Sequence, residues 1–299
     1  MGLFLFASDL LAVSASICIA FSSMLVVELN GRVDVFRLSR WNMVSALVMT
    51  GTVSLVLGGW RTLDTREVGL LAASSLFGII IASTTYYMAI YAAGPRTTAL
   101  LFSLTSPFAL ALGYAVLGEK ITARQGLGIA LVLCGIVLAI RGRGAGRPAP
   151  PAATSAAPWV GVALGVVTAL GQAIGSLLAR PAMAAGVEPF TAMAVRAGVA
   201  ATFFLAITIL PIAVLHRPYR FAPRDLGTAV TASFFGTGLG MSLLMAALAQ
   251  GPVGTVSTLS SITPVVILPM VWIRTRIAPP RLAWIGAALA VAGTALISL

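Results

Sequence analysis

The sequence predicts an all-helical membrane protein with ten transmembrane helices, arranged as two inverted five-helix repeats around a central cavity. Its composition is the first reason: 59% of the 299 residues are hydrophobic and 9% are charged, whereas soluble proteins contain about 25% charged residues. The second reason is a glycine and proline motif that occurs twice, 157 residues apart. The third is one long linker, rich in glycine, proline and alanine, near the middle of the chain.

Ten apolar stretches are long enough to cross a bilayer. A transmembrane helix needs about 20 mainly apolar residues, and charged residues, Gly-Pro pairs and polar clusters mark the breaks between such stretches. We expect the first stretch to be a span rather than a signal peptide, because it lacks a basic region before it and a small-residue cleavage site after it. The ten predicted helices lie near 8–28, 38–58, 69–92, 96–117, 123–141, 158–179, 190–215, 226–249, 253–273 and 280–298.

The linker at 142–157 divides the chain into a first repeat at 1–141 and a second repeat at 158–299. Its residues, arginine and glycine followed by proline, alanine and serine, are typical of a flexible segment. Each half holds five predicted helices. Because five is an odd number, the second half enters the membrane from the opposite side, and the two repeats are inverted relative to each other.

The repeated motif places Gly-Pro between the third and fourth helices of each half. Proline lacks the amide donor and glycine accepts turn dihedral angles, so each copy predicts a helix, a tight turn and a second helix with a proline in its middle. A weaker echo pairs Arg40 in the second predicted helix with Arg196 in the seventh. We expect hinges at the six motif residues, which are Gly94, Pro95, Pro107, Gly251, Pro252 and Pro264.

The acidic residues and the only histidine, His216, fall in loops or at the ends of the predicted helices. Ionisable residues inside a membrane bundle are expensive and mark ion or proton pathways, so the absence of an acid or a histidine from the middle of the predicted helices favours facilitated diffusion or exchange over proton coupling. No nucleophile–base pair and no set of metal ligands can be assembled within the membrane. We therefore expect no enzyme activity, no metal and no cofactor.

Basic residues, which give the chain a formal net charge of +11, lie mostly between the apolar stretches. Basic residues in such positions anchor membrane loops, so the expected partner is the lipid bilayer and not a nucleic acid. Loops after odd-numbered helices carry most of them. The positive-inside rule then places these loops in the cytoplasm and both termini outside.

Hydroxyl, amide, aromatic and methionine side chains form stripes on several predicted helices and are the candidate substrate-binding residues. Small hydroxyl residues also serve helix packing, and Gln172 suits a contact between helices as well as a contact with substrate. Methionine suits a tolerant pocket because it is flexible and polarizable. The candidates are Ser83, Tyr86, Tyr87, Ser103, Ser106, Gln172, Ser176, Met241, Ser242, Met245, Ser257, Ser260 and Ser261.

Glycines in the last helix of each half predict a close helix pair. Gly128 and Gly135 in the fifth helix correspond to Gly286 and Gly293 in the tenth, and small residues let membrane helices approach closely. This pairing suits packing within one chain or between two, so the protein is expected to be a monomer or a homodimer. The glycine-rich run at 236–240 is also assigned to close helix packing.

The chain resembles the drug/metabolite transporter superfamily, and more narrowly its EamA-type ten-span exporters. The residues that carry the resemblance are Gly94-Pro95, Ser106-Pro107 and Gly118-Glu119 in the first half, and Gly251-Pro252 and Thr263-Pro264 in the second. Within this group the chain is similar to the aromatic amino acid exporters. The resemblance implies both termini in the cytoplasm, against the count of basic residues. It also implies a glutamate where Arg274-Thr275-Arg276 stands.

The expected function is export of amino acids, aromatic and other apolar ones included, across the bacterial inner membrane by alternating access. The resemblance implies the membrane and the class of small metabolite. The lack of a buried carboxylate favours broad specificity and a facilitative or exchange mechanism. The alternatives are a carrier of other small metabolites or drugs, and a membrane scaffold that transports nothing.

Overall fold

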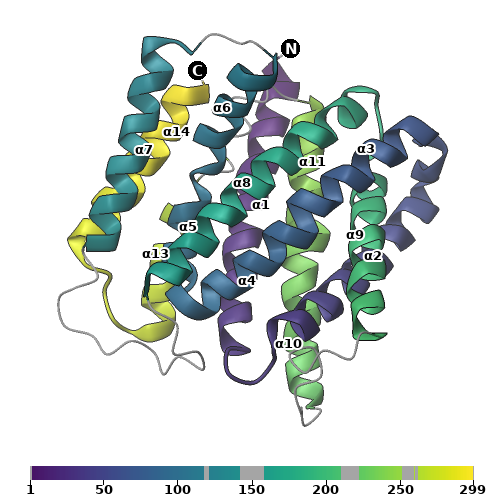
Figure 1. Ribbon diagram of the computed structural model, residues 1–299, viewed down its shortest axis with the longest axis horizontal. Coiled ribbons are helices and arrows are strands. Elements are labelled where there is room, and N and C mark those ends of the chain that lie inside the picture. The colour runs from purple at the N-terminus through teal and green to yellow at the C-terminus, as the bar shows by residue number, and fades with distance from the viewer. Residues whose placement is uncertain are drawn as a thin grey trace.

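The computed structural model describes residues 2–117, 121–141, 158–209, 222–250, 259 and 262–298. Within these residues all regular structure is helical and no strand occurs, which confirms the predicted fold class (Figure 1). Ten helical stretches follow one another at the predicted places. Six of them contain helices that are long and apolar enough to cross a membrane, by length and composition.

The first half consists of five helical stretches, of which the third and fourth are composite. The third contains a π-helix, in which the hydrogen bonds span five residues instead of four. The elements in order are α1 (Gly2–Glu28), α2 (Val35–Leu57), the 3₁₀-helix η1 (Gly59–Thr62), α3 (Thr65–Ser75), the π-helix η2 (Leu76–Ile81), α4 (Ala82–Ala93), α5 (Pro95–Phe102), α6 (Thr105–Leu117) and α7 (Ala123–Arg141).

The second half repeats this order, again with a π-helix in its third stretch. The predicted helix at 253–273 is described only at residue 259 and from residue 262 onward. The elements are α8 (Pro158–Ala184), α9 (Pro189–Ala206), the 3₁₀-helix η4 (Ile207–Ile209), α10 (Pro223–Ser233), the π-helix η6 (Phe234–Gly240), α11 (Met241–Gln250), α13 (Thr263–Thr275) and α14 (Arg281–Ser298).

Local capping explains where several helices begin. The Asp34 carboxylate accepts a hydrogen bond from the Arg37 amide and caps α2, and Glu188 accepts hydrogen bonds from the first amides of α9. Such side-chain oxygens satisfy amides that have no partner inside the helix. Gly94, with φ of 80°, separates α4 from α5, and a positive φ of this kind favours glycine.

The two halves pack in reciprocal pairs. Helix α1 packs against η6 and α11 of the second half, and α8 packs in the same way against η2 and α4 of the first. Helix α1 also contacts α13, while α8 contacts α5 and α6. The remaining helices pair with their own counterparts, α2 with α9 and α7 with α14. This pattern is unchanged when the halves are exchanged, as expected for repeats related by a pseudo-two-fold axis.

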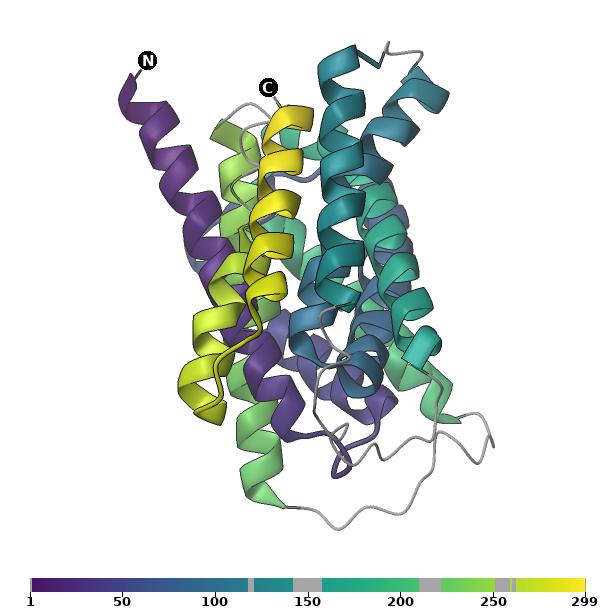
Figure 2. The same cartoon turned by 90° about the vertical axis from the view of Figure 1, so that its left-hand side faces the viewer.

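The chain direction shows that the repeats are inverted. In Figure 2, α1 starts at the top of the molecule and descends, and α7 also descends from the top. The second half therefore begins on the side away from the N-terminus. Helix α14 climbs back to the top, so the two termini lie at the same end. Inversion thus follows from the odd number of helices in each half.

Helices α7 and α14 form the close pair that their glycines predict, and they do so within one chain (Figure 1). A Cβ atom added at Gly128 would lie 2.6 Å from the Gly293 carbonyl oxygen. One added at Gly286 would lie 2.5 Å from the Gly135 carbonyl oxygen. Any side chain at these positions would separate the two backbones, so the four glycines set the distance between the helices.

The prolines of the repeated motif differ from the prediction, because neither lies in the middle of a helix. Helix α5 ends at Phe102 and α6 begins at Thr105, which makes Pro107 the third residue of α6. Pro264 is the second residue of α13. Proline is tolerated in a first turn, where its missing amide would have no partner anyway. The Thr105 hydroxyl donates a hydrogen bond to the Phe102 carbonyl oxygen at 2.7 Å and so satisfies a carbonyl group at the break between α5 and α6.

Candidate functional site

The two π-helices occupy matched positions in the two repeats. Each follows a serine, Ser75 before η2 and Ser233 before η6, and each has glycine as its third residue, Gly78 and Gly236. The two segments begin 158 residues apart. Because π-helices are rare and are frequent at functional sites, a matched pair in the third helix of each repeat marks this region as the candidate site.

The two serines make equivalent hydrogen bonds across the halves. The Ser75 hydroxyl donates to the carbonyl oxygen of Arg196 on α9 at 2.6 Å. The Ser233 hydroxyl donates to the carbonyl oxygen of Asn42 on α2 at 2.7 Å. Arg196 and Asn42 are therefore the corresponding positions of the two repeats. The sequence-based pairing of Arg196 with Arg40 is wrong by two residues, because single-residue echoes cannot fix a helical register.

Arg196 is fully buried, with a side chain that is 0% exposed. Its guanidinium lies beside the η2 π-helix, where a Cβ atom at Gly78 would be 2.8 Å from Nη2. Nη1 contacts the Met193 sulfur at 3.5 Å, whereas Nε and Nη2 have no hydrogen-bond partner. The ion pairs between described residues lie elsewhere and join Arg32 with Asp225, Arg37 with Asp34, and Arg274 with Glu28.

The corresponding place in the first repeat holds a neutral group. The Asn42 side-chain oxygen accepts a hydrogen bond from the Thr237 hydroxyl of η6 at 2.8 Å, and its Nδ2 is buried without a partner. The Tyr87 hydroxyl also interacts with Thr237. The two halves therefore share a backbone arrangement and differ in charge, because one carries a guanidinium where the other carries an amide.

The predicted tyrosines lie in the interior of the molecule. The rings of Tyr86 and Tyr87 contact each other edge to face at 6.0 Å between centroids, and Tyr86 contacts Phe102 in the same way at 6.1 Å. The Tyr86 hydroxyl interacts with Ser23 of α1. These rings pack among α1, α4 and α5 of the first half, and Tyr87 also belongs to an apolar cluster with Ala229 and Ala232 of α10 in the second half.

The helix pair α4–α8 gathers another group of polar side chains, among which Gln172 is a predicted substrate-binding residue. The hydroxyls of Thr85 and Thr168 are 2.8 Å apart, and Gln172, one helical turn further along α8, is buried. Sequence reasoning missed the reason for this close crossing. Gly171 and Gly175 form a small-xxx-small pair of the kind that allows membrane helices to touch. A Cβ atom at Gly171 would lie 2.9 Å from the Phe77 carbonyl oxygen.

The opposite crossing, between α1 and η6, confirms the packing role assigned to the glycines at 236–240. A Cβ atom at Gly236 would collide with the Ser22 side chain, and one at Gly240 would lie 3.1 Å from Ile19. The Ser22 hydroxyl donates to the Ala232 carbonyl at 2.7 Å. Both π-helices thus lie against the first helix of the other half with little or no side chain between the backbones.

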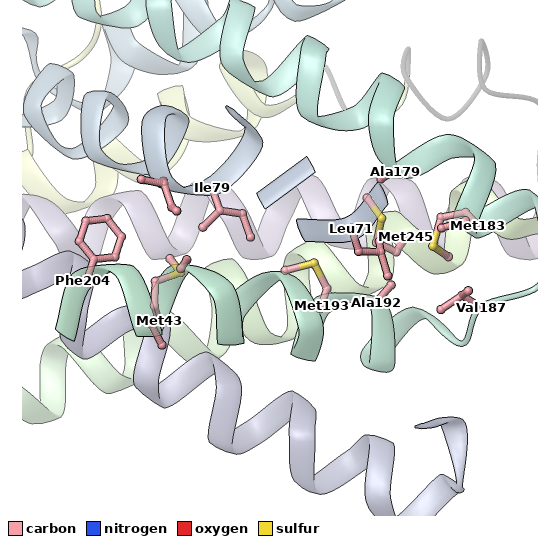
Figure 3. Close-up of a cluster of buried hydrophobic side chains, with 14 residues drawn as sticks. Met43, Leu71, Ile79, Ala179, Met183, Val187, Ala192, Met193, Phe204 and Met245 are labelled. Carbon is pink, nitrogen blue, oxygen red and sulfur yellow. The ribbon is translucent and has the colours of Figure 1, made fainter. Parts of the chain in front are cut away.

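Met245 belongs to a core of buried apolar side chains, shown in Figure 3. Met43, Met193 and Met245, from α2, α9 and α11, are all fully buried there. Met193 also contacts the guanidinium of Arg196. Methionine fills irregular spaces and rearranges easily, so the apolar surroundings of the arginine are adaptable.

The remaining predicted residues are divided between buried and partly exposed positions. The Ser103 and Ser242 hydroxyls are buried and have no hydrogen-bond partner, and Ser106 is also buried. Ser83, Ser176 and Met241 are half-buried. The predicted residues Gly251, Pro252, Ser257, Ser260 and Ser261, together with Gly118-Glu119, lie outside the described residues.

Comparisons with known proteins agree on the kind of molecule. The model of the EamA-like transporter family matches residues 6–141 and 159–299. A protein of Synechocystis sp. named an uncharacterized transporter is 28% identical over 126 residues, which is 42% of this chain and 38% of that protein. A solved crystal structure superposes with a TM-score of 0.71 at 18% identity and covers 98% of this chain and 96% of its own. This last likeness concerns the fold alone.

Proposed function

The chain belongs to the EamA-like transporter family, and from this premise we propose that it exports amino acids, aromatic and other apolar ones included, by alternating access. Transport by a multi-pass membrane protein follows from the family and from the apolar helices. The substrate, the mechanism and a location in the bacterial inner membrane are our proposal.

The reciprocal packing of the two halves carries this proposal. Each π-helix lies against the first helix of the opposite half, η2 against α8 and η6 against α1. In an inverted repeat, each half can adopt the conformation of the other, which exchanges an opening on one side for an opening on the other side. The π-helices in the third helix of each half offer matched places where such a change can be absorbed.

The side chains between the halves suit an amphiphilic solute. Tyr86, Tyr87 and Phe102 offer aromatic edges and faces, while Gln172 and the Thr85–Thr168 pair offer hydrogen-bonding groups nearby on α4 and α8. Methionines let a pocket accept side chains of different shape. Amino acids with apolar side chains combine these requirements.

The acidic residues support a facilitative or exchange mechanism. Among the described residues, Asp225 is the one buried acid. It lies in the first turn of α10 and forms an ion pair with Arg32 at 3.1 Å. A carboxylate at a helix end that is already paired is poorly placed to carry a proton through the middle of the membrane.

Transport in liposomes tests the proposal. The purified protein is reconstituted, and the uptake of labelled amino acids is followed against an internal pool of the same amino acid, with protein-free liposomes as the control. We expect saturable exchange that is strongest for aromatic and aliphatic amino acids and is not concentrated by a pH gradient. Absence of saturable flux for every amino acid would refute amino acid export, and strong accumulation driven by the gradient would refute the facilitative mechanism.

A further inference from the structure

We propose that Arg196 is a binding site for the carboxylate of the transported solute, so that this protein selects small organic acids with an apolar part. The inference rests on the proposed transport function and deepens it. It adds a charged group to the hydroxyl, amide, aromatic and methionine side chains that the sequence predicts as substrate-binding residues.

The first argument is the cost of the isolated charge. Arg196 is 0% exposed and its carbonyl is bound by Ser75, but its side chain forms none of the ion pairs between described residues. A buried charge without a counter-ion is strongly unfavourable. Charged residues within membrane spans therefore pair with a partner or mark a substrate pathway. Arg196 lacks a partner of this kind, so an anionic ligand is the group that would balance its charge.

The second argument is the geometry of the unpaired atoms. Nη1 contacts the Met193 sulfur, whereas Nε and Nη2 are buried and unpaired. Nε and Nη2 form one edge of the planar guanidinium, and their two parallel N–H groups match the two oxygens of a carboxylate. The edge that can bind a carboxylate bidentately is thus the edge left without a partner.

The third argument is the position of this edge. Nη2 lies beside Gly78, the third residue of the η2 π-helix, and a Cβ atom there would be 2.8 Å from Nη2. Gly78 also touches Gly175 of α8. The arginine therefore lies where the two halves cross, and a movement of η2 relative to α8 and α9 would change its access. Met193 of the methionine core contacts Nη1 of the same guanidinium, so apolar side chains that suit an apolar substituent lie close to the arginine.

The fourth argument is the asymmetry between the repeats. The equivalent residue, Asn42, carries an amide that is held by Thr237. Two guanidinium groups would be expected to bind a dianion or to repel each other. A single guanidinium at these two matched positions suits a solute with a single carboxylate.

Binding measurements on detergent-purified protein test this site. The wild type and the variants Arg196→Gln, Arg196→Lys and Arg40→Gln are titrated with phenylalanine, phenylalanine amide and 3-phenylpropionate, and binding is followed as the shift in thermal unfolding temperature. Arg40→Gln is the matched control, since it removes a positive charge from the corresponding helix of the other repeat. Size-exclusion chromatography confirms that each variant is folded.

We expect the wild type to bind phenylalanine and 3-phenylpropionate more tightly than the amide. Arg196→Gln should weaken binding of the two acids roughly 10- to 100-fold, the factor for losing a charge-assisted hydrogen bond, and should change binding of the amide less than about threefold. Arg196→Lys keeps the charge but loses the paired donors, so it should weaken the acids by about tenfold. Arg40→Gln should bind as the wild type does.

The outcomes separate this inference from the proposed function. Binding of phenylalanine that is unchanged in Arg196→Gln would overturn the inference and leave amino acid transport standing. Binding of 3-phenylpropionate alone, lost in Arg196→Gln, would support the carboxylate site and refute amino acid transport. If Arg196→Gln does not fold, the lysine variant decides, because undiminished binding of the acids by Arg196→Lys would overturn the site. No binding of either acid by the wild type would overturn both.

Discussion

Gly78 lies where η2, α8 and α9 meet, and its missing side chain is what allows them to meet. A Cβ atom there would be 3.0 Å from the Gly175 Cα and 2.8 Å from the guanidinium of Arg196. The arginine can move because it is the end of a flexible side chain, whereas the backbone of α8 cannot yield in the same way. At the residue scale, these glycines decide how closely the halves approach.

Gly175→Ala should destabilise the protein. Its Cβ atom would collide with the Gly78 Cα and lie 2.7 Å from the Gly78 amide nitrogen, both of them backbone atoms. Overpacking of this kind costs roughly 1–3 kcal/mol, and thermal unfolding in detergent measures the loss. Gly69→Ala is the control, because nothing lies within 4 Å of its added Cβ atom. That variant should be neutral or more stable by up to about 1 kcal/mol. Equal stability of the two variants would contradict the close crossing of η2 and α8.

At the element scale, the helices fall into two groups. The third and fourth helices of each half, as far as the structure describes them, pack between the halves together with α1, α2, α8 and α9. The pair α7–α14 packs chiefly on itself, with smaller contacts to α5, α6 and α13. The first group holds the polar residues of the candidate site, and the second holds the glycine seam. We therefore assign substrate selectivity to the first group of helices and structural support to the pair α7–α14.

Gly135→Leu should affect stability and not selectivity. A side chain at residue 135 would meet the Gly286 carbonyl oxygen, 2.5 Å from its Cβ atom, and would push α14 away. We expect a loss of roughly 1–3 kcal/mol or more in unfolding free energy, with an unchanged KM for the transport that remains. Gly126→Ala on the same helix, with nothing within 4 Å, is the control. A changed KM for Gly135→Leu would show that the seam takes part in substrate binding.

At the scale of the whole molecule, the inverted repeat fixes which segments share a side of the membrane. Helix α1 begins and α14 ends at one end of the molecule, while α7 runs away from that end (Figure 2). Exchanging the halves maps each side of the membrane onto the opposite side. If each half adopts the conformation of the other, the entrance on one side of the membrane closes and the entrance on the other side opens. Alternating access in such a fold is this exchange.

Protease protection in sealed vesicles tests this topology. Tags at the two ends of the chain should be cleaved from the same side of the membrane, and a protease site inserted in the linker at 142–157 should be cleaved from the other side. The side that bears the tags also decides between the count of basic residues and the family resemblance. Cleavage of one terminal tag from each side would contradict ten spans.

The number and position of the helices could be read from the sequence alone. The bilayer sets the length of an apolar span and excludes unpaired backbone groups, so hydropathy and Gly-Pro breaks place the helices without knowledge of their neighbours. The close packing of the fifth and tenth helices was also predictable, because their glycines suit close packing, whereas the contacts of Gly128 with Gly293 and of Gly135 with Gly286 came from the structure. The inversion followed from counting helices.

Only the tertiary structure decided the arrangement of the site. The π-helices at 76–81 and 234–240 have no sequence signal of their own, because their hydrogen-bond register is settled by packing against α8 and α1. The equivalence of Arg196 with Asn42 depends on hydrogen bonds from Ser75 and Ser233 that cross between the halves. Whether a charge within a span is paired is a question of three-dimensional neighbours. The isolation of Arg196 therefore became visible only when the helices were packed together.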